Sequence, residues 1–504
     1  GVAELRKSNY KNLNASMINF ELAIDEFDLG SSNTSDYSIG GSSSEATQVG
    51  YVYKAGYIYD NKYMVEVAGR YDGHYYFAPG KRFGFFPSFS VGWRLSEERF
   101  MESFDFINSL KLRGSWGKSG NLAGSAYQFL AGYSFNPNQY AFGGNMVPGA
   151  YPNNEANPNI TWEVSNKSNV GIEANLWKNL LTIEADYFYE RRNGMLLPPA
   201  ITVPFEYGIG LSDENEGVMD NHGFEIAIGS IHQFQNGLKL ELSGNFSFAR
   251  NKMVNVFESA ATYDNPNRRR TGRPINTPFG YRATGLFSTS DDINGDGIID
   301  GNDGYNIVQF SELHPGDIIY EDINKDGKID PNDEVPIGYS TYPEITYGFT
   351  PAIEWKGFDL ALFFQGVGRN SLDVNNRFQT ISLYNTQSNT DYEYYNNRWT
   401  PENENARYPR AYIGPNPNNN SVNSSFWYVK ADYLRLKNAT LGYSIPKSIL
   451  RNINIDNLRV YFTGTNIFTF SKVDFFDPEA IQRGGGAGNY PAMKQYIFGI
   501  KLTL

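Results

Sequence analysis

The sequence predicts an all-β fold: a transmembrane antiparallel β-barrel, with about fourteen spanning strands in this chain and with long extracellular loops. Three observations support this. Apolar and polar residues alternate with a period of two along many segments, as in strands with one apolar and one polar face. Short turns and long polar stretches follow each other in regular order. Residues that favour strands and turns are abundant, with 36 Tyr, 35 Phe and 50 Gly.

The strands are predicted from the alternation itself. Between Leu238 and Phe248 every second residue is apolar or Gly, and the residues between them are Lys, Glu, Ser and Asn. A phase change between Leu436 and Leu441 predicts a β-bulge near Asn438. In chain order, the same alternation predicts strands over Tyr63–Tyr71, Val170–Leu176, Leu181–Glu190, Phe224–Ile228, Leu238–Phe248, Phe358–Phe364, Leu458–Phe470 and Tyr496–Leu504.

The connections between strands distinguish a barrel from a soluble sandwich, in which long loops would fall at both ends. Asn, Asp and Gly favour tight hairpins, and they predict short turns at Asp60-Asn61, Lys178-Asn179, Asn236-Gly237 and Lys356-Gly357. Long polar stretches cover residues 119–160, 191–222, 251–341, 368–428 and 471–492. Short periplasmic turns opposite long extracellular loops are typical of outer-membrane barrels. If the last strand ends in the periplasm, every long loop lies outside, provided that residues 251–341 form one irregular excursion.

Composition excludes several classes of protein and site. A net charge of −12 argues against nucleic-acid binding, and the absence of Cys excludes disulfides and thiolate sites. No apolar run approaches the length of a transmembrane helix. The four His show no metal-ligand spacing, and there is no nucleophile elbow. We therefore predict no enzymatic activity, and we expect Glu184, Asp186 and Glu190 to line a hydrated passage rather than to act as a glycosidase pair.

Two segments have the spacing of calcium loops. In DINKDGKIDPND, oxygen ligands come from Asp322, Asn324, Asp326, the Lys328 carbonyl, Asp330 and Asp333, and in DINGDGIIDGND from Asp292, Asn294, Asp296, the Ile298 carbonyl, Asp300 and Asp303. A Gly at the sixth position permits the sharp turn. Many oxygen ligands favour Ca²⁺ over Mg²⁺, and Asp at the twelfth position indicates weak binding. We expect a structural ion that orders a long excursion without a core of its own. The alternative is a pair of solvated turns without an ion.

Candidate substrate contacts come from an aromatic cluster near residues 391–399 and from the start of a later strand. Aromatic rings stack on sugars, but Tyr and Trp also form the interfacial girdles of membrane barrels. Packing or a girdle role is therefore the favoured interpretation. The candidates are Tyr392, Tyr394, Tyr395, Trp399 and Trp427.

Several blocks resemble the SusC/RagA family of TonB-dependent outer-membrane transporters of Bacteroidetes. Together they cover most of the chain in the order of that family. The blocks are FFPSFSVGWRLSEERFM (Phe85–Met101), LKLRGSWGKSGN (Leu110–Asn121), PGDIIYEDINKDGKIDPNDEVPIGYSTYPEITYGF (Pro315–Phe349), NNRWTPENENARYPR (Asn396–Arg410), YVKADYLRLKNATLGYSIP (Tyr428–Pro446) and LRVYFTGTNIFTFS (Leu458–Ser471).

The resemblance implies a 22-stranded barrel occluded by a plug, capped by a SusD-like surface lipoprotein and driven by the TonB complex. Import of oligosaccharides, or of peptides in some members, is the implied function. The chain shows no TonB box and no plug, so residues 1–504 are expected to be the C-terminal portion of such a barrel in outer-membrane lipid. A self-contained fourteen-stranded barrel, a surface adhesin and a soluble calcium-binding β protein remain as alternatives.

Overall fold

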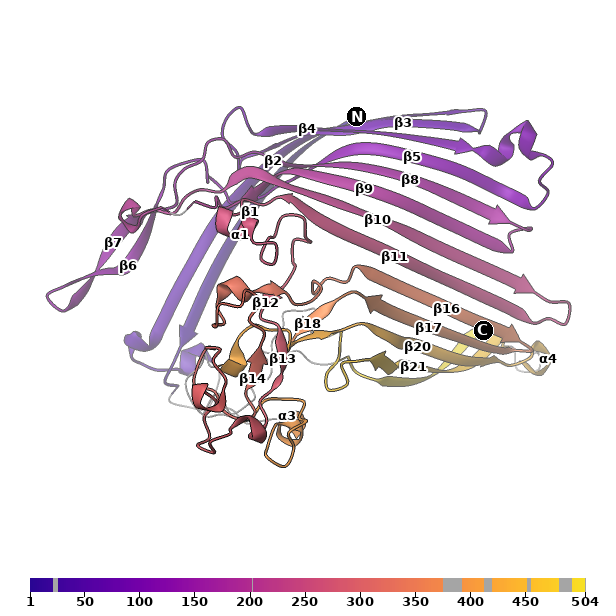
Figure 1. Cartoon of the computed structure of the whole chain (residues 1–504). Helices are drawn as coiled ribbons and strands as arrows, with labels where there is room; N and C mark the ends of the chain where they lie inside the picture. The colour runs from indigo at the N-terminus through magenta and orange to yellow at the C-terminus, as the bar shows by residue number, and fades with distance from the viewer. Residues whose placement is uncertain are drawn as a thin grey trace.

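The computed structural model shows one curved antiparallel sheet with additional structure at one end (Figure 1). It describes residues 1–20, 26–201, 203–374, 392–411, 419–450, 455–479 and 492–503. Each of the sheet's fourteen strands pairs with the strands before and after it in the series. In order they are β1 (Val2–Met17), β2 (Tyr37–Tyr59), β3 (Tyr63–His74), β4 (Phe83–Arg94), β5 (Ile107–Asn121), β8 (Glu163–Leu176), β9 (Leu181–Leu197), β10 (Glu214–Gln233), β11 (Lys239–Asn255), β16 (Ile345–Trp355), β17 (Phe358–Gly368), β20 (Tyr433–Ser444), β21 (Asn457–Ser471) and β22 (Gln495–Thr503).

The fold is all-β, and its main sheet is antiparallel with fourteen strands. This confirms the predicted fold class and the predicted number of strands. In the part of the chain that the structure describes, β1 and β22 form the two edges and are not paired with each other. The predicted bulge is also confirmed, because the register of β20 shifts between Leu436 and Asn438 against β21, and opposite Phe363 and Phe364 of β17.

All short turns lie at one end of the sheet, on the right in Figure 1. Asp60, Asn61, Lys178 and Asn179 have positive φ angles between 49° and 63°, and Gly357 has a φ of 87°. These are the conformations that Asn, Asp and Gly adopt most readily. The predicted tight hairpins are therefore present, and the long connections gather at the opposite end.

Several predicted loops contain more regular structure than expected. β9 continues to Leu197 and β10 begins at Glu214, so the irregular part of the predicted 191–222 loop is confined to its middle. The segment 119–160 contains a projecting hairpin formed by β6 (Tyr133–Phe142) and β7 (Asn145–Pro152). Residues 251–341 are not uniformly irregular, because they contain short paired strands.

The remaining elements are short and lie mostly in these connections. The paired strands are β12 (Phe279–Gly280) with β15 (Val335–Pro336), β13 (Ala283–Leu286) with β14 (Ile318–Tyr320), and β18 (Ser371–Asp373) with β19 (Tyr428–Lys430). The α-helices are α1 (Ala260–Asp264), α3 (Tyr392–Asn397) and α4 (Lys447–Leu450). The 3₁₀ turns are η1 (Phe27–Leu29), η2 (Thr34–Asp36), η3 (Leu95–Glu97), η4 (Arg99–Met101), η5 (Phe205–Tyr207), η6 (Thr289–Asp291), η7 (Gly301–Asp303), η8 (Pro331–Asp333) and η9 (Asn419–Ser421).

A hydrophobic core lies in the connections between strands. Side chains from three connections, which follow β11, β17 and β21, are buried against one another, and we call this unit the loop cluster. Its buried members are Tyr281, Ile318, Tyr320, Ile329, Leu372, Val374, Tyr394, Tyr408, Trp427, Ala431 and Val473. The expectation that residues 251–341 have no core of their own was wrong, because Phe287, Ile299 and Leu313 of this segment are buried against one another. Other side chains of the segment belong to the loop cluster, whose core they share with distant segments.

The two faces of the sheet differ in chemistry. Cross-strand pairing places Ile228, Gly244 and Phe349 in one row on one face, the apolar face. The next residues along the strands, Ala227 and Asn245, lie on the other face, the polar face. Leu242 on the apolar face is 53% exposed, because none of the described elements packs over it. A large bare apolar face is expected of a barrel wall in contact with hydrocarbon.

Candidate functional site

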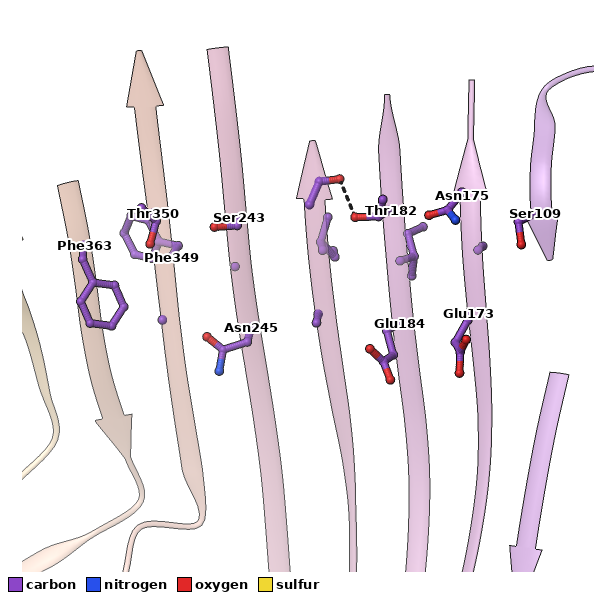
Figure 2. Close-up of a pocket in the computed structure, with 17 residues that line it drawn as sticks. Ser109, Glu173, Asn175, Thr182, Glu184, Ser243, Asn245, Phe349, Thr350 and Phe363 are labelled. Atoms are coloured by element: carbon purple, nitrogen blue, oxygen red, sulfur yellow. Dashed lines mark hydrogen bonds between the residues drawn. The ribbon is translucent and has the colours of Figure 1, made fainter. Parts of the chain in front are cut away.

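The polar face forms a continuous wall across six strands. Cross-strand pairing aligns Lys111, Glu173, Glu184, Ala227, Asn245 and Gly348 in a single row. A hollow of 510 Å³ lies over this row. Figure 2 shows that Glu173, Glu184 and Asn245 project to the same side of the sheet. Hydroxyl and amide groups surround the carboxylates, and the labelled side chains among them are Ser109, Asn175, Thr182, Ser243 and Thr350.

Charges on the wall are organised around Arg113. Its guanidinium Nη2 lies 2.7 Å from a Glu184 oxygen and 2.5 Å from an Asp186 oxygen, and its Nε lies 3.0 Å from Glu173. The Lys111 ammonium is 3.2 Å from Glu173. Three carboxylates on neighbouring strands would repel one another without such partners. The two cations therefore hold the carboxylates along the wall in a fixed, hydrated arrangement.

The carboxylates weighed as a glycosidase pair are engaged by arginines. Glu184 and Asp186 both contact Arg113, as described above, and Glu190 lies 3.6 Å from Arg192. The two carboxyl groups of a glycosidase flank the glycosidic bond that is cleaved. Here the carboxylate oxygens meet arginine side chains instead. The geometry therefore supports the expectation that these residues line a passage.

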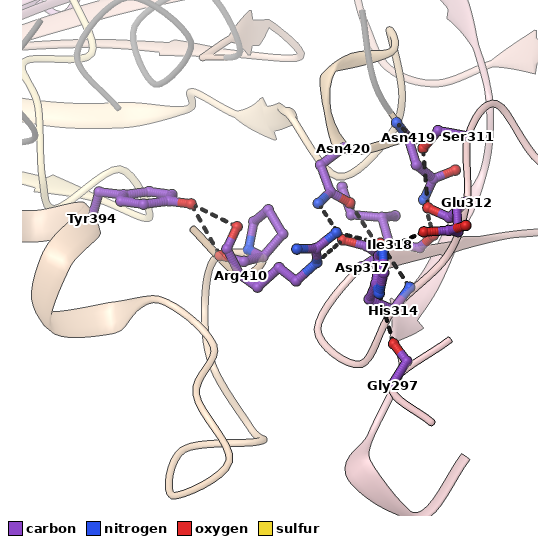
Figure 3. Close-up of polar contacts among 11 residues, drawn as sticks. Gly297, Ser311, Glu312, His314, Asp317, Ile318, Tyr394, Arg410, Asn419 and Asn420 are labelled. Carbon is purple, nitrogen blue, oxygen red and sulfur yellow. Dashed lines mark hydrogen bonds and ion pairs between the residues drawn. The ribbon is translucent and has the colours of Figure 1, made fainter. Parts of the chain in front are cut away.

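The loop cluster contains a buried polar network centred on Asp317 (Figure 3). Arg410 contacts both carboxylate oxygens of Asp317, at 2.7 and 3.2 Å. The Asn420 amide donates to Asp317 at 2.7 Å, and the His314 backbone N–H donates to it at 2.9 Å. Asp317 is 1% exposed. Its charge is thus satisfied by residues from two connections, which this network ties together.

Buried tyrosines extend the same network. The Tyr320 hydroxyl donates to the Asn419 carbonyl at 2.7 Å, and Asn419 donates to the Ile318 carbonyl at 2.7 Å. Burial raises the pKa of Tyr281 to about 12, and it raises the pKa of Tyr305 to about 12 as well. These hydroxyls therefore stay neutral at any physiological pH, and the Tyr305 hydroxyl accepts a hydrogen bond from the Gln309 amide at 3.1 Å.

The predicted calcium loops have almost identical internal hydrogen bonding. In the second loop, Asp322 accepts from the backbone N–H groups of Lys325 and Gly327, and Asp333 accepts from Ile323 and Asn324. The first loop repeats this pattern from Asp292 and Asp303, with His314 contacting its Gly297 carbonyl at 2.6 Å.

The donor set of these loops fits Ca²⁺ chemically, because it consists of carboxylate, amide and carbonyl oxygens. Within the described ranges, however, no three acidic or His side chains are gathered into a group that could hold a metal ion. Asp300 and Asp330 instead cap η7 and η8 by accepting from Asn302 and Asn332. The alternative of self-capped turns therefore describes this arrangement, and ion binding stays a prediction.

The aromatic candidates divide into buried and exposed residues. Trp427, Tyr394 and Trp399 are buried in the loop cluster or beside it. The Trp427 indole donates to the Asn420 carbonyl at 2.8 Å, and the Tyr394 hydroxyl donates to the carbonyls of Pro409 and Arg410. These three pack the loops in this structure, and a role for them in substrate contact stays a prediction. Tyr392, 84% exposed, and Tyr395 are the only members of this set with an accessible ring.

The sequence profile of the family "TonB dependent receptor-like, beta-barrel" matches residues 6–314 of the chain. This match covers more than half of the chain and includes Arg113 and five of the six strands of the wall. The chain belongs to this TonB-dependent receptor family. The SusC/RagA resemblance that the motifs predicted is confirmed, and the family places the chain in the outer membrane.

Curated relatives of the receptor match nearly the whole chain. TonB-dependent receptor P26 of Formosa agariphila is 28% identical over 465 residues, which cover 89% of this chain and 45% of the relative. TonB-dependent receptor SusC of Bacteroides thetaiotaomicron is 25% identical over 483 residues, covering 90% and 44%. This receptor chain thus spans less than half of the length of the curated relatives it matches.

Solved structures give the same fold. The structure of the RagAB peptide transporter aligns with a TM-score of 0.76 at 24% identity, and covers 99% of this chain and 52% of that one. Among the described residues of the receptor, no helix is both long enough and apolar enough to cross a membrane.

Sequence reasoning missed the two arginine-centred sites of the receptor. Arg113 and Arg410 are ordinary charges in the sequence, and their carboxylate partners are distant in the chain. The signal that could have found the first site is the alternation along the strands, which places Arg113 on the same face as Asp186. No local signal marks Asp317, since its side-chain partners Arg410 and Asn420 come from another connection.

Proposed function

We propose that the chain forms the C-terminal portion of a TonB-dependent outer-membrane importer that takes up oligosaccharides. The observation that carries this proposal is the wall of hydroxyl, amide and ion-paired carboxylate groups over a hollow of 510 Å³, with a bare apolar face behind it. Such a wall exchanges hydrogen bonds with hydroxyl-rich solutes, while its charges are already paired. Specific polar groups of this kind orient ligands in clefts.

Residues 1–504 belong to one barrel portion in this proposal, and residues 251–341 to an extracellular excursion within it. The C-terminus would lie in the periplasm, together with the short turns. The plug, the contact with the TonB complex and the remaining strands would belong to other parts of a longer polypeptide, consistent with the 45% of its relatives' length that the chain spans. A SusD-like lipoprotein would meet the loop cluster at the surface.

The uptake of labelled oligosaccharides by cells tests this proposal. Cells that lack the full-length protein are expected to lose uptake, and the restored wild type is expected to regain it. The double variant Ser243→Leu, Asn245→Leu should lower uptake by about fivefold or more, because each lost hydrogen bond is worth about 1 kcal/mol. Leu242→Ile, on the opposite face of the same strand, is the matched control.

Peptide import is the main alternative, and labelled peptides supplied to the same strains test it. Uptake of peptides without uptake of oligosaccharides would replace the proposed substrate class. If neither solute enters while the protein is displayed at the surface, the oligosaccharide proposal fails. Import of another nutrient, a structural barrel and an adhesin are then the alternatives.

We further propose that the two aspartate-rich loops bind calcium weakly, since both loops have the same oxygen donor set. Millimolar calcium should then slow proteolysis within residues 251–341 of the full-length protein. The double variant Asp322→Ala, Asp326→Ala should lose the protection around residues 322–333, because it removes two of the ligands of that loop. Magnesium at equal concentration is the control, and an unchanged digestion pattern in the wild type would reject calcium binding.

A further inference from the structure

On the apolar face, the side chains of β9, β10, β11 and β16 change in type toward the loop end of the strands. Residues that lie opposite one another on these strands form a row. The rows near Gly244 contain aliphatic side chains, those after them form an aromatic belt, and the last ones form a charged rim. The aliphatic and mixed rows contain Ile228, Gly244 and Phe349, then Ile226, Phe246 and Tyr347. The belt and rim contain Tyr187, Phe224, Phe248 and Ile345, then Tyr189, His222 and Arg250, then Arg191, Asp220 and Lys252.

A groove lies in the aliphatic rows. Its volume is 660 Å³, and its side-chain walls come from Ile226, Ile228, Leu242, Phe246, Tyr347 and Phe349. Gly244 forms its floor, because a Cβ at this position would lie 3.3 Å from the Gly348 carbonyl oxygen and 3.5 Å from the Phe349 Cβ. The missing side chain therefore leaves a channel in a wall that is otherwise filled by large apolar groups.

The rim carries more cations than carboxylates. Arg191 pairs with Asp220 at 2.6 Å. Arg250 and Arg369 share Glu344, at 3.3 and 3.4 Å. Lys252 adds a further charge beside Arg250. The four basic side chains of the rim therefore exceed its two carboxylates by two positive charges. His222 lies in the same region, opposite Arg250.

Arg369 belongs to the same face as the groove. Its guanidinium carbon lies 5.5 Å from the centre of the Phe248 ring, which is part of the aromatic belt. Cations over aromatic rings at such a boundary keep one side in hydrocarbon and the other in water. The positive rim is therefore continuous with the apolar surface below it, and is not part of the polar wall.

The spacing of groove and rim matches one leaflet. Gly244 and Arg250 are six residues apart on one strand, which corresponds to ~20 Å along the strand. At a strand tilt of about 40° this becomes ~15 Å along the membrane normal, which is half of a hydrocarbon core ~30 Å thick. A charged group at the rim and an acyl chain over Gly244 can thus belong to one molecule.

We propose that this surface is a binding site for a phosphorylated lipid of the leaflet on the loop side. The phosphate lies against Arg250, Lys252 and Arg369, and one acyl chain occupies the groove over Gly244. Continuity with the membrane-facing wall argues for a lipid, and the excess of positive charge argues for an anionic headgroup. The proposal rests on the membrane placement of the barrel and is independent of the solute that is imported.

Native mass spectrometry of the full-length protein in detergent tests the site, with phosphatidylglycerol as the probe and phosphatidylcholine of the same acyl chains as the neutral comparison. The wild type should retain phosphatidylglycerol preferentially. The triple variant Arg250→Gln, Lys252→Gln, Arg369→Gln should lose this preference, with about a fivefold weakening for each cation removed. These side chains are partly exposed, and the glutamines keep amide donors within reach of Glu344, so the variant should fold.

Lys239→Gln is the matched control, because Lys239 lies on β11 but pairs with Glu354 at the turn end. It should bind lipid as the wild type does. Gly244→Leu should weaken retention of both lipids by filling the groove. Equal retention by the triple variant and the wild type would overturn the proposal, as would full displacement of the lipid by equimolar inorganic phosphate. Because no transport is measured, failure here leaves the importer proposal intact.

Discussion

Leu242→Arg is expected to destabilise the folded protein in a bilayer by about 2 to 4 kcal/mol, the cost of Arg on a lipid face near the midplane. Leu242 lies opposite Pro351 of β16, near the middle of the apolar row that runs from Ile345 to Trp355. An arginine there must lie in hydrocarbon or distort the bilayer to reach water. Urea titration of the protein in lipid vesicles, followed by the mobility shift between folded and unfolded forms, measures the change.

Ser243→Arg supplies the control, because the neighbouring residue of the same strand lies on the polar face. Its side chain meets water, so its effect on unfolding should be close to zero. If the two arginine substitutions lower the free energy of unfolding equally, the assignment of the two faces is contradicted. If Ser243→Arg is the more destabilising one, Ser243 and not Leu242 faces the lipid.

Asp317→Ala is expected to cost the loop cluster about 3 to 5 kcal/mol of local stability, as breaking a buried ion pair does when one partner stays. The substitution leaves the Arg410 guanidinium, the Asn420 amide and the His314 N–H without their shared acceptor. Hydrogen exchange of amides in β13 and β14 should rise, while exchange in the main sheet stays unchanged. Mass-spectrometric exchange on the full-length protein resolves the two regions.

Asp474→Ala is the comparison within the same cluster. Asp474 pairs with Arg407 at 2.8 Å, but its side chain is 70% exposed, and pairs of this kind contribute only about 0 to 1 kcal/mol. Its exchange pattern should match that of the wild type. If both variants behave alike, the network around Asp317 does not hold the loops together.

The strands and turns of this protein were predictable because their determinants are local. Alternation along Leu238–Phe248 specifies which side chains share a face, and Asp60-Asn61 specifies a hairpin, whatever the rest of the chain does. The bulge near Asn438 was visible as a change of phase for the same reason. Every strand of a barrel wall alternates between apolar and polar residues, and so the number of strands predicted from this alternation agreed with the sheet.

The loop cluster was not predictable in this way, because its core joins residues that no periodicity connects. Tyr281, Trp427 and Val473 belong to three different connections, and their burial depends on how those connections meet. The same holds for Asp317 and Arg410. The aspartate-rich loops were predictable in part. Their turn geometry followed from the spacing of Asp, Asn and Gly, whereas the binding of an ion depends on a partner outside the chain.

The shared core of the loop cluster bears on the order of folding. Tyr281 precedes β16, whereas Val473 follows β21, so this core closes only after β16, β17, β20 and β21 have been brought into register. Contacts of such large sequence separation form late and slowly. The surface loops should therefore acquire their final shape in a single step near the end of barrel assembly, and a chain halted before β21 would present them unfolded to the quality-control proteases of the envelope.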